Sequence, residues 1–230
     1  MSMLRFELES KAASPQNLEL ELRLLVIAGW TGRNLAAVQH HIDELAVLGV
    51  PAPSKTPLFY RVSADLVTQA SEIQVVGEST SGEVEPFIFK VSDQVFVSIA
   101  SDHTDRDLER VSVAASKQVC SKPVAAKAWL IDEVLGHWDQ LILRSWILEE
   151  NQKRLYQEGA LVSIRPIDNL LSAFEQEGMV FDHGVAMSCG TLAALGSIRP
   201  SSGFFMQLED PVLGRTIDHH YSTASLPVVT

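Results

Sequence analysis

The chain has 230 residues, a formal net charge of −11 and a hydrophobic fraction of 46%. These values are typical of a globular protein with a sizeable core, and no apolar run reaches the roughly 18 residues that a membrane-spanning helix needs. The acidic charge argues against nucleic acids and anionic membranes as partners. The N-terminal residues lack the pattern of a signal peptide, and the two cysteines form no CxxC pair. We therefore expect a reduced, cytoplasmic setting.

The N-terminal 56 residues predict a β-hairpin followed by a helix. Apolar side chains alternate with polar ones over residues 4–8 and again over 18–24, on either side of a polar turn, which is a hairpin pattern. Residues 34–48 repeat apolar side chains at helical spacing, with Asn34 as the N-cap and Gly49 just past the end. We expect this portion, residues 1–56, to precede a catalytic domain over residues 57–230, the two forming one compact unit.

The rest of the chain predicts short strands with few helices. Between residues 57 and 101, apolar runs are broken by Gly, Ser and Asp. Thr104 and Asp107 have the spacing of a capping box and predict a helix over residues 104–118. A second helix is expected over 167–178, and the clearest strands at 58–62, 73–78, 83–89, 94–100, 141–148, 178–190 and 203–209. Without a βαβ rhythm, this pattern predicts an α+β fold that is mostly β.

Three acidic residues are the first candidate site. Glu83 and Glu85 stand two apart on a predicted strand, so they share a face with Phe87 and Phe89. Carboxylates on such an apolar strand repel one another unless a cation or a proton offsets their charge. Together with Asp102, at the end of the 94–100 strand, they form a hard oxygen site suited to Mg²⁺, Mn²⁺ or Ca²⁺. The alternative is an acidic strand end beside an Asp that starts a helix.

A second candidate is the pair His41 and Glu44, which lie at i and i+3 of the first predicted helix. A carboxylate that holds an imidazole is a common way to build a general base for water. The alternative is a histidine at the edge of the core with a chance neighbour. Arg106 and Lys117 flank the 104–118 helix and could hold a substrate carboxylate or carbonyl, or form surface ion pairs.

Other motifs carry less chemistry. The adjacent histidines His219 and His220 point to opposite faces of a strand, so they cannot easily hold one ion. Ser188 lacks the G-x-S-x-G elbow of a serine hydrolase, and nothing in the sequence indicates that Cys189 is activated. We expect the tryptophans to be core or interface residues, namely Trp129, Trp138 and Trp146.

Taken in order, the motifs resemble the fumarylacetoacetate hydrolase superfamily. Its members pair an H-x-x-E helix with an E-x-E strand, followed by an N-D-x-S-x-R-D-x-Q turn, a K-S element and a late G-D-V-x-x-x-G-T-P segment. Over residues 28–222 this chain has "HIDEL", "GEVE", "SDHTDRDLE", "SKQVCSKPVA" and "DHGVAMSCGTL" in the same order. The segment "YQEG", residues 156–159, stands where the family has a Gln-rich strand and a Gly. The finer resemblance is to a bacterial branch of uncharacterised proteins.

The resemblance implies a mixed β-roll with a small N-terminal portion, and a metal-dependent hydrolase. In this reading Glu83, Glu85 and Asp102 hold one Mg²⁺ or Mn²⁺. The substrate is a small anionic oxo acid or 1,3-dicarbonyl of the acylpyruvate type, and a C–C bond is cleaved through a metal-bound enolate. His41, oriented by Glu44, activates a water. The substrate oxygens are anchored by Lys117, which is also counted as catalytic, and by Arg106, Gly190 and Thr191.

The same enolate chemistry would also serve a decarboxylase, a hydratase or an isomerase, and a non-catalytic binding module with this fold is a second alternative. Four positions depart from the family motifs and leave the substrate open: Ser101 replaces Asn, Glu109 replaces Gln, Gln118 replaces Ser and Leu192 replaces Pro. Glu109 would repel an anionic ligand if its side chain faced the site. The family also implies a homodimer, with Trp138 or Trp146 at the interface.

Overall fold

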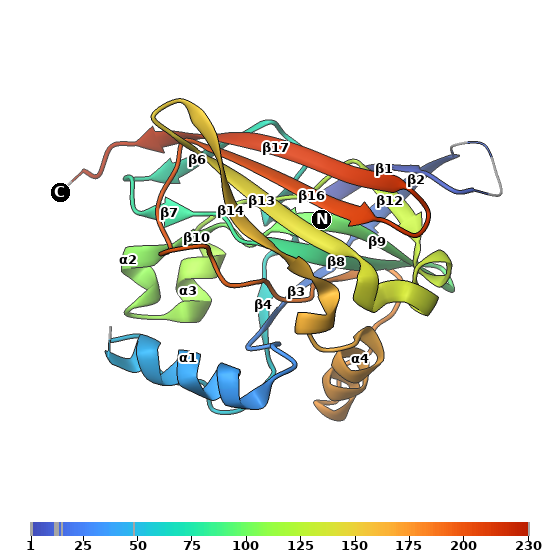
Figure 1. Ribbon diagram of the computed structural model, residues 1–230, viewed down its shortest axis with the longest axis horizontal. Helices are drawn as coiled ribbons and strands as arrows, with labels where there is room; N and C mark the ends of the chain where they lie inside the picture. The colour runs from blue at the N-terminus through green and yellow to red at the C-terminus, as the bar shows by residue number, and fades with distance from the viewer. Residues whose placement is uncertain (1, 12–13, 15, 48, 230) are drawn as a thin grey trace.

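A computed structural model describes residues 2–11, 14, 16–47 and 49–229 and contains two large sheets that face each other (Figure 1). The first has the order β2-β1-β12-β9-β8-β15-β3-β4, and its strands are β1 (Ser2–Leu8), β2 (Gln16–Leu22), β3 (Leu24–Gly29), β4 (Leu58–Val62), β8 (Val84–Val91), β9 (Gln94–Ser101), β12 (Lys127–Leu130) and β15 (Val185–Ser188). The second has the order β14-β13-β16-β17-β6, with β6 (Glu72–Val76), β13 (Ile142–Glu149), β14 (Gln152–Ala160), β16 (Gly203–Asp210) and β17 (Arg215–Leu226).

Short elements join the sheets at one end. Two ribbons pair β7 (Thr80–Ser81) with β10 (Thr104–Asp105), and β5 (Val67–Thr68) with β11 (Lys122–Pro123). The α-helices are α1 (Leu35–Val47), α2 (Arg106–Glu109), α3 (Val113–Gln118) and α4 (Ile167–Gln176). The 3₁₀ turns are η1 (Ala64–Leu66), η2 (Ile131–Glu133), η3 (Leu135–Gln140) and η4 (Leu161–Ser163). Among the described residues, no helix is long and apolar enough to cross a bilayer.

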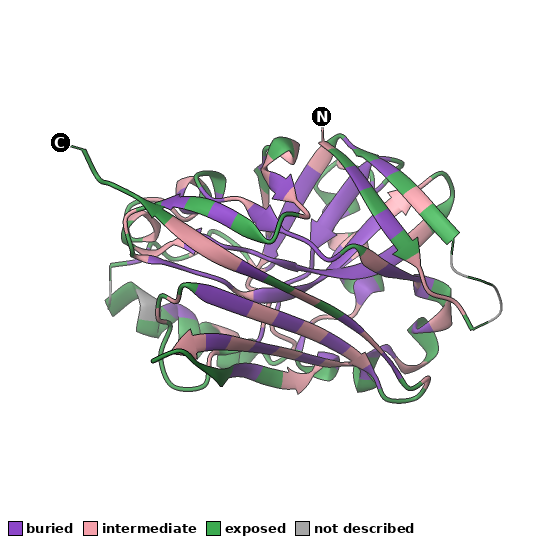
Figure 2. Cartoon of the chain, turned by 90° about the horizontal axis from the view of Figure 1, so that it is seen from above, coloured by how far each residue is buried: buried purple, intermediate pink, exposed green. Residues whose placement is uncertain are grey.

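The central strands of the eight-stranded sheet are buried on both faces, whereas β1 and β2 at one edge alternate between buried and exposed residues. One face packs against the five-stranded sheet, and this core contains Val84 and Ile88 of β8 together with Phe204 of β16. The other face curls around a second core, in which Phe87 and Phe89 of β8 meet side chains from β1, β2, β3 and β4. The first six residues of β8 are therefore buried without alternation. Figure 2 shows buried strand segments running through the middle of the molecule, with exposed segments toward its outside. This curled, mostly β architecture confirms the fold predicted from the sequence.

Most predicted elements are present, with shifted ends. The hairpin forms as β1 and β2, although part of its turn lies outside the described residues. The amide groups of Ala36 and Ala37 donate to the Asn34 side chain, which confirms the N-cap of α1. β1 to β3 belong to the same sheet as β8 and β9, so the N-terminal portion shares the core of the remainder.

Other predictions were wrong in ways that matter for the site. Residues 104–118 do not form one helix, because the chain breaks after α2 and restarts at α3 with Ser112 as a new N-cap. The N-cap of α2 is Asp105, whereas Thr104 donates to the carbonyl of Asp102, so the predicted capping box is absent. Of the strand expected over 178–190 only β15 forms, and the buried strand β3 was not predicted separately.

Candidate metal centre

The three predicted carboxylates meet at one end of the β8–β9 hairpin. Glu83 directly precedes β8 and Asp102 directly follows β9, and the amide of Asp102 donates to the carbonyl of Glu83 at 3.0 Å. Glu85 lies inside β8, two residues from Glu83, so its side chain returns to the same side. One carboxylate oxygen from each of the three lies within 4.8 Å of the others. The antiparallel register of β8 and β9 therefore brings together three acidic residues that lie within 19 positions of one another in the sequence.

Two lysines neutralise the deepest of these carboxylates. Asp102 is fully buried, and its Oδ2 accepts a hydrogen bond from Lys117 of α3, while Lys122 of β11 lies 3.0 Å from its Oδ1. Burial alone would raise the pKa of Asp102, but the two ammonium groups hold it well below its usual range. Burial alone would lower the pKa of Lys117, but the negative charges of Asp102 and Glu83 outweigh this effect and raise it. The pKa of Lys122 is lowered, by burial first.

Glu85 is the least compensated member of the cluster. It is 3% exposed, and the hydrogen bond that it accepts comes from the amide of Gly190 at 3.1 Å. Burial and the nearby Asp102 carboxylate raise the pKa of Glu85 well above its ordinary value, against the opposing effect of Lys117. A carboxylate in this position is stabilised by either a proton or a cation.

The cluster fits a divalent cation. Oδ1 of Asp102 is buried without a hydrogen bond, because the ammonium of Lys122 approaches it outside hydrogen-bond geometry. The donor set is three carboxylates with no sulfur or nitrogen ligand, which is the chemistry that Mg²⁺ and Mn²⁺ prefer. Glu83, Glu85 and Asp102 would hold the ion, and the residues present are suited to it.

Arg106, at the start of α2, is held by partners within the protein. Its guanidinium lies 3.3 Å from Glu83, 2.9 Å from Glu109, and donates from Nε to the Ser81 hydroxyl at 2.7 Å. Glu83 and Glu109 raise the pKa of Arg106 against the effect of burial, which is the largest influence and would lower it. The structure thus places Glu109 against Arg106, where it neutralises part of the positive charge expected to anchor a substrate.

Gly190 and Thr191 support the cluster from the turn after β15. Gly190 has φ +100°, and a Cβ there would lie 1.7 Å from the Thr31 hydroxyl oxygen, so only glycine fits. The hydroxyl of Thr191 donates to the carbonyl of Val84 at 2.7 Å and accepts from the side chain of Gln157. Gln157 also accepts from the amide of Val84, so it fixes the turn against the strand that bears Glu85.

His41 and Glu44 pair with each other on the exposed surface of α1. Their side chains are 55% and 60% exposed, with 3.6 Å between His41 Nδ1 and the Glu44 carboxylate. The His41 ring lies 6.0 Å from the ring of Trp30, whose indole donates to the Tyr60 hydroxyl. Lys117 in turn lies 5.6 Å from the Tyr60 ring. The dyad is thus linked to the acidic cluster through two aromatic side chains, and no hydrogen bond between described residues joins the two groups directly.

Several site residues were not found from the sequence. Besides Lys122, these are His103, Thr80 and Tyr221. His103 binds the hydroxyls of Tyr221 and Thr80, and Tyr221 binds Ser101, which the family motif had already singled out. Burial, followed by the charges of Lys122 and Arg106, lowers the pKa of His103 to about 3. The only sequence signal was adjacency, because Ser101 and His103 flank Asp102, whereas Tyr221 comes from a strand more than 100 residues later.

Among the described residues, Glu83, Glu85 and Asp102 are the one group of three or more His, Cys, Asp or Glu side chains close enough to share a metal ion, and none of the weaker candidates belongs to it. Ser188 is buried in β15, and Cys189 is buried with a raised pKa, first because of burial. Burial also lowers the pKa of His219 to about 4. Trp129 and Trp138 are buried in the core between the sheets.

Comparisons with known proteins agree with this fold. Residues 28–221 match the family model described as "Protein of unknown function (DUF2848)". No curated protein matches the sequence. Among solved structures, an Oleispira antarctica protein named as a fumarylacetoacetate isomerase/hydrolase superposes with a TM-score of 0.67 at 16% identity, over 95% of this chain and 99% of that one.

Two further structures have the same fold. A Burkholderia cenocepacia protein named as a fumarylpyruvate hydrolase has a TM-score of 0.62 at 16% identity, over 99% of this chain and 97% of that one. A 2-keto-3-deoxyarabinonate dehydratase has a TM-score of 0.65 at 13% identity, over 90% and 75% of the two chains. The resemblance predicted from the motifs is therefore confirmed at the level of the fold. The chain belongs to the DUF2848 family, whose fold is that of the fumarylacetoacetate hydrolases.

Proposed function

We propose that this protein is a divalent-metal-dependent hydrolase that cleaves a C–C bond in a small oxo acid or 1,3-dicarbonyl compound. The observation that carries the proposal is the cluster of Glu83, Glu85 and Asp102, in which Glu85 and Asp102 are buried and Glu83 is partly buried, with one oxygen of each within 4.8 Å of the others. A buried like-charged cluster is costly unless a cation binds to it. The names of the structural neighbours, a fumarylpyruvate hydrolase and an oxo-acid dehydratase, support this substrate class.

The charges around the cluster favour an anion of low charge. Four carboxylates, those of the triad and Glu109, face three cations, namely Lys117, Lys122 and Arg106. A bound divalent ion would convert the single excess negative charge into a single positive one. The site would then attract a monoanion such as the carboxylate of a 2-oxo acid.

When bound, the cation would supply Lewis-acid stabilisation of negative charge on the substrate oxygens. The protein supplies the remaining functions. Lys117 is the cation best placed to hold a substrate oxygen, because its ammonium contacts Asp102, one of the three proposed metal ligands. Gly190 fixes the orientation of Glu85 through its amide. His41, paired with Glu44, is the general base that removes a proton from the attacking water, and closure of α1 over the cluster would bring it into range.

A lyase or isomerase reaction on the same substrate class is the second candidate. It is favoured by the dehydratase among the structural neighbours and by the exposed position of His41, which in this conformation leaves the cluster without a general base. In that case decarboxylation, hydration or isomerisation would replace hydrolysis. We place the enzyme in the cytoplasm as a homodimer.

The test is a substrate panel assayed with the purified protein and either Mg²⁺ or Mn²⁺. The panel contains acylpyruvates, oxaloacetate and 2-hydroxydienoates, with the Glu85→Gln variant as the metal-site control. Hydrolysis of an acylpyruvate that is lost in Glu85→Gln supports the hydrolase. Turnover of oxaloacetate or a dienoate alone supports a lyase, and turnover of no compound by a metal-loaded protein supports a non-catalytic binding module.

A further inference from the structure

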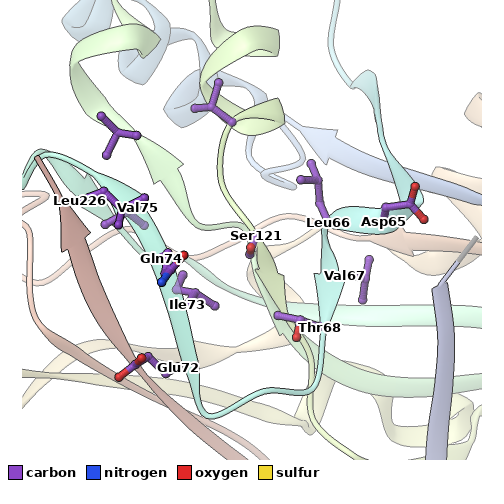
Figure 3. A pocket seen from close by; sticks show the side chains of 12 residues that line it. Asp65, Leu66, Val67, Thr68, Glu72, Ile73, Gln74, Val75, Ser121 and Leu226 are labelled. Atoms are coloured by element: carbon purple, nitrogen blue, oxygen red, sulfur yellow. The ribbon is translucent and has the colours of Figure 1, made fainter. Parts of the chain in front are cut away.

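The open groove beside β6 is not suited to the proposed substrate. A cavity of about 570 Å³ lies there, between β6 and the ribbon of β5 and β11 (Figure 3). Its charged lining residues are Asp65 and Glu72, and no described lysine or arginine lines it, so it would repel an anion. None of its lining residues belongs to the acidic cluster. Recognition of the substrate therefore falls to the side chains around the cluster itself.

Two glycines stand beside Glu85 across the eight-stranded sheet. β15 pairs with β8 on one side and with β3 on the other. When these registers are continued by two residues, Glu85, Gly190 and Gly29 fall in one row across the three strands. Residues in one row share a face of the sheet, and neither glycine has a side chain there. The space beside Glu85 is therefore filled by side chains from outside the row.

Tyr60 of β4 fills the space over Gly29. A Cβ at Gly29 would lie 2.8 Å from Cε2 of the Tyr60 ring, so the glycine allows the ring to lie across the end of β3. The ring centroid is 5.6 Å from the ammonium of Lys117, which contacts Asp102. The partly exposed Tyr60 ring is therefore one cation–π contact away from a proposed metal ligand.

Trp30 extends this apolar surface. Its indole donates to the Tyr60 hydroxyl at 3.3 Å, and its side chain is partly exposed. The residue has φ +62°, a left-handed conformation that is unusual for a bulky side chain and that concentrates at functional sites. The next residue, Thr31, lies against Gly190, whose amide binds Glu85. Trp30 and Tyr60 thus form an aromatic wall next to the cluster.

The cations around the cluster each face a carboxylate of the protein. Lys117 and Lys122 face Asp102, and Arg106 lies between two glutamates, one of which is Glu109. With a divalent ion bound, the site carries one excess positive charge, which the carboxylate of a 2-oxo acid balances. A second carboxylate at the far end of the substrate would find no unpaired cation among these described residues, and Glu109 would repel it.

We infer that the substrate carries an uncharged planar group, an aryl or alkenyl substituent, at the end away from the metal, and that Trp30 and Tyr60 select this group. The planar group lies against the aromatic wall, where burial and ring contacts stabilise it. The inference rests on the proposed function for the metal-binding end of the substrate. It narrows the substrate class to 2,4-dioxo acids with an uncharged, unsaturated substituent, of which benzoylpyruvate is a simple aromatic example.

Equilibrium binding to the Mn²⁺-loaded protein tests this specificity apart from turnover. The probe 4-phenyl-2-oxobutanoate has the 2-oxo acid and the ring but lacks the second carbonyl, so the proposed hydrolysis cannot cleave it. In isothermal titration calorimetry it should bind roughly 10-fold more tightly than 2-oxobutanoate, which lacks the ring. It should also bind roughly 10-fold more tightly than its para-carboxylate analogue, which has the ring and a second charge.

Trp30→Leu and Tyr60→Leu should each reduce the preference over 2-oxobutanoate to below about 3-fold. The control Trp146→Leu, which removes a ring from β13 of the other sheet, should keep the preference. A rise in Tm with Mn²⁺ in all three variants shows that they fold and bind metal. Equal Kd values for the three compounds, no binding of the phenyl compound, or a preference that survives both wall substitutions would overturn the inference. The hydrolase fails separately, if neither acetylpyruvate nor benzoylpyruvate is cleaved while the expected Kd ratios are found.

Discussion

Replacing Glu85 by Gln separates metal binding from folding. Gln has nearly the same shape, and its side-chain oxygen can still accept the hydrogen bond from the Gly190 amide. In the metal-free protein, burial and Asp102 raise the pKa of Glu85, so its ionised form lowers stability at neutral pH. The variant should therefore melt at the same temperature as wild type or a few degrees above it when no metal is present.

With metal the order should reverse. A ligand at 100 times its Kd stabilises a protein by about 2.7 kcal/mol, and in a chain of this size each kcal/mol raises Tm by about 2–4 °C. In a thermal-melting assay, saturating Mn²⁺ should thus raise the Tm of the wild type by roughly 5–10 °C and leave the Tm of Glu85→Gln unchanged. Glu78→Gln, which removes an exposed carboxylate from the same region, should keep the full shift. A full shift in Glu85→Gln would refute the assignment of Glu85 as a ligand.

Three other substitutions probe the surrounding residues. His41→Ala should keep metal binding and lose at least about 100-fold in hydrolysis, measured as kcat; unchanged turnover would exclude it as the base. Glu109→Gln should free hydrogen-bond donors of Arg106 and lower the KM for an oxo acid with a distal carboxylate by roughly 10-fold. Asp107→Asn, which removes an exposed carboxylate from the same helix, should leave this KM unchanged; an equal decrease in both variants would show that the change in net charge, and not the release of Arg106, is the cause. In the metal-free protein, the folded state keeps His103 neutral, with a pKa of about 3. The free energy of unfolding should therefore decrease as the pH falls from about 6.5, where an unfolded histidine takes up its proton, toward 3. His103→Gln should reduce that slope by up to about 1.4 kcal/mol per pH unit in chemical denaturation, and an unchanged slope would contradict a neutral buried His103.

The sequence was most informative where the chemistry is local. Glu83 and Glu85 share one strand, and Asp102 follows the next, so a single hairpin register was enough to bring them together. Alternation likewise predicted the first hairpin, and Asn34 predicted the start of α1, because capping depends on residues two and three positions away.

Sequence patterns failed where distant segments decide the structure. The break between α2 and α3 was missed, because helical spacing continues through residues 110–112 while Ser112 caps a new helix. Lys122 and Tyr221 reach the site through a ribbon and a strand of the second sheet, and no local pattern indicates such long-range pairing. The role of Glu109 also depended on geometry, since only the structure shows that it binds Arg106.

The central claim is that Glu83, Glu85 and Asp102 bind one divalent ion. The most direct measurement is anomalous diffraction at the manganese edge from crystals grown with Mn²⁺. A single strong peak per chain, with an oxygen of each of the three carboxylates within about 2.0–2.6 Å, is the expected result. A manganese peak bound only by other residues, or none at this cluster under saturating Mn²⁺, would contradict the account.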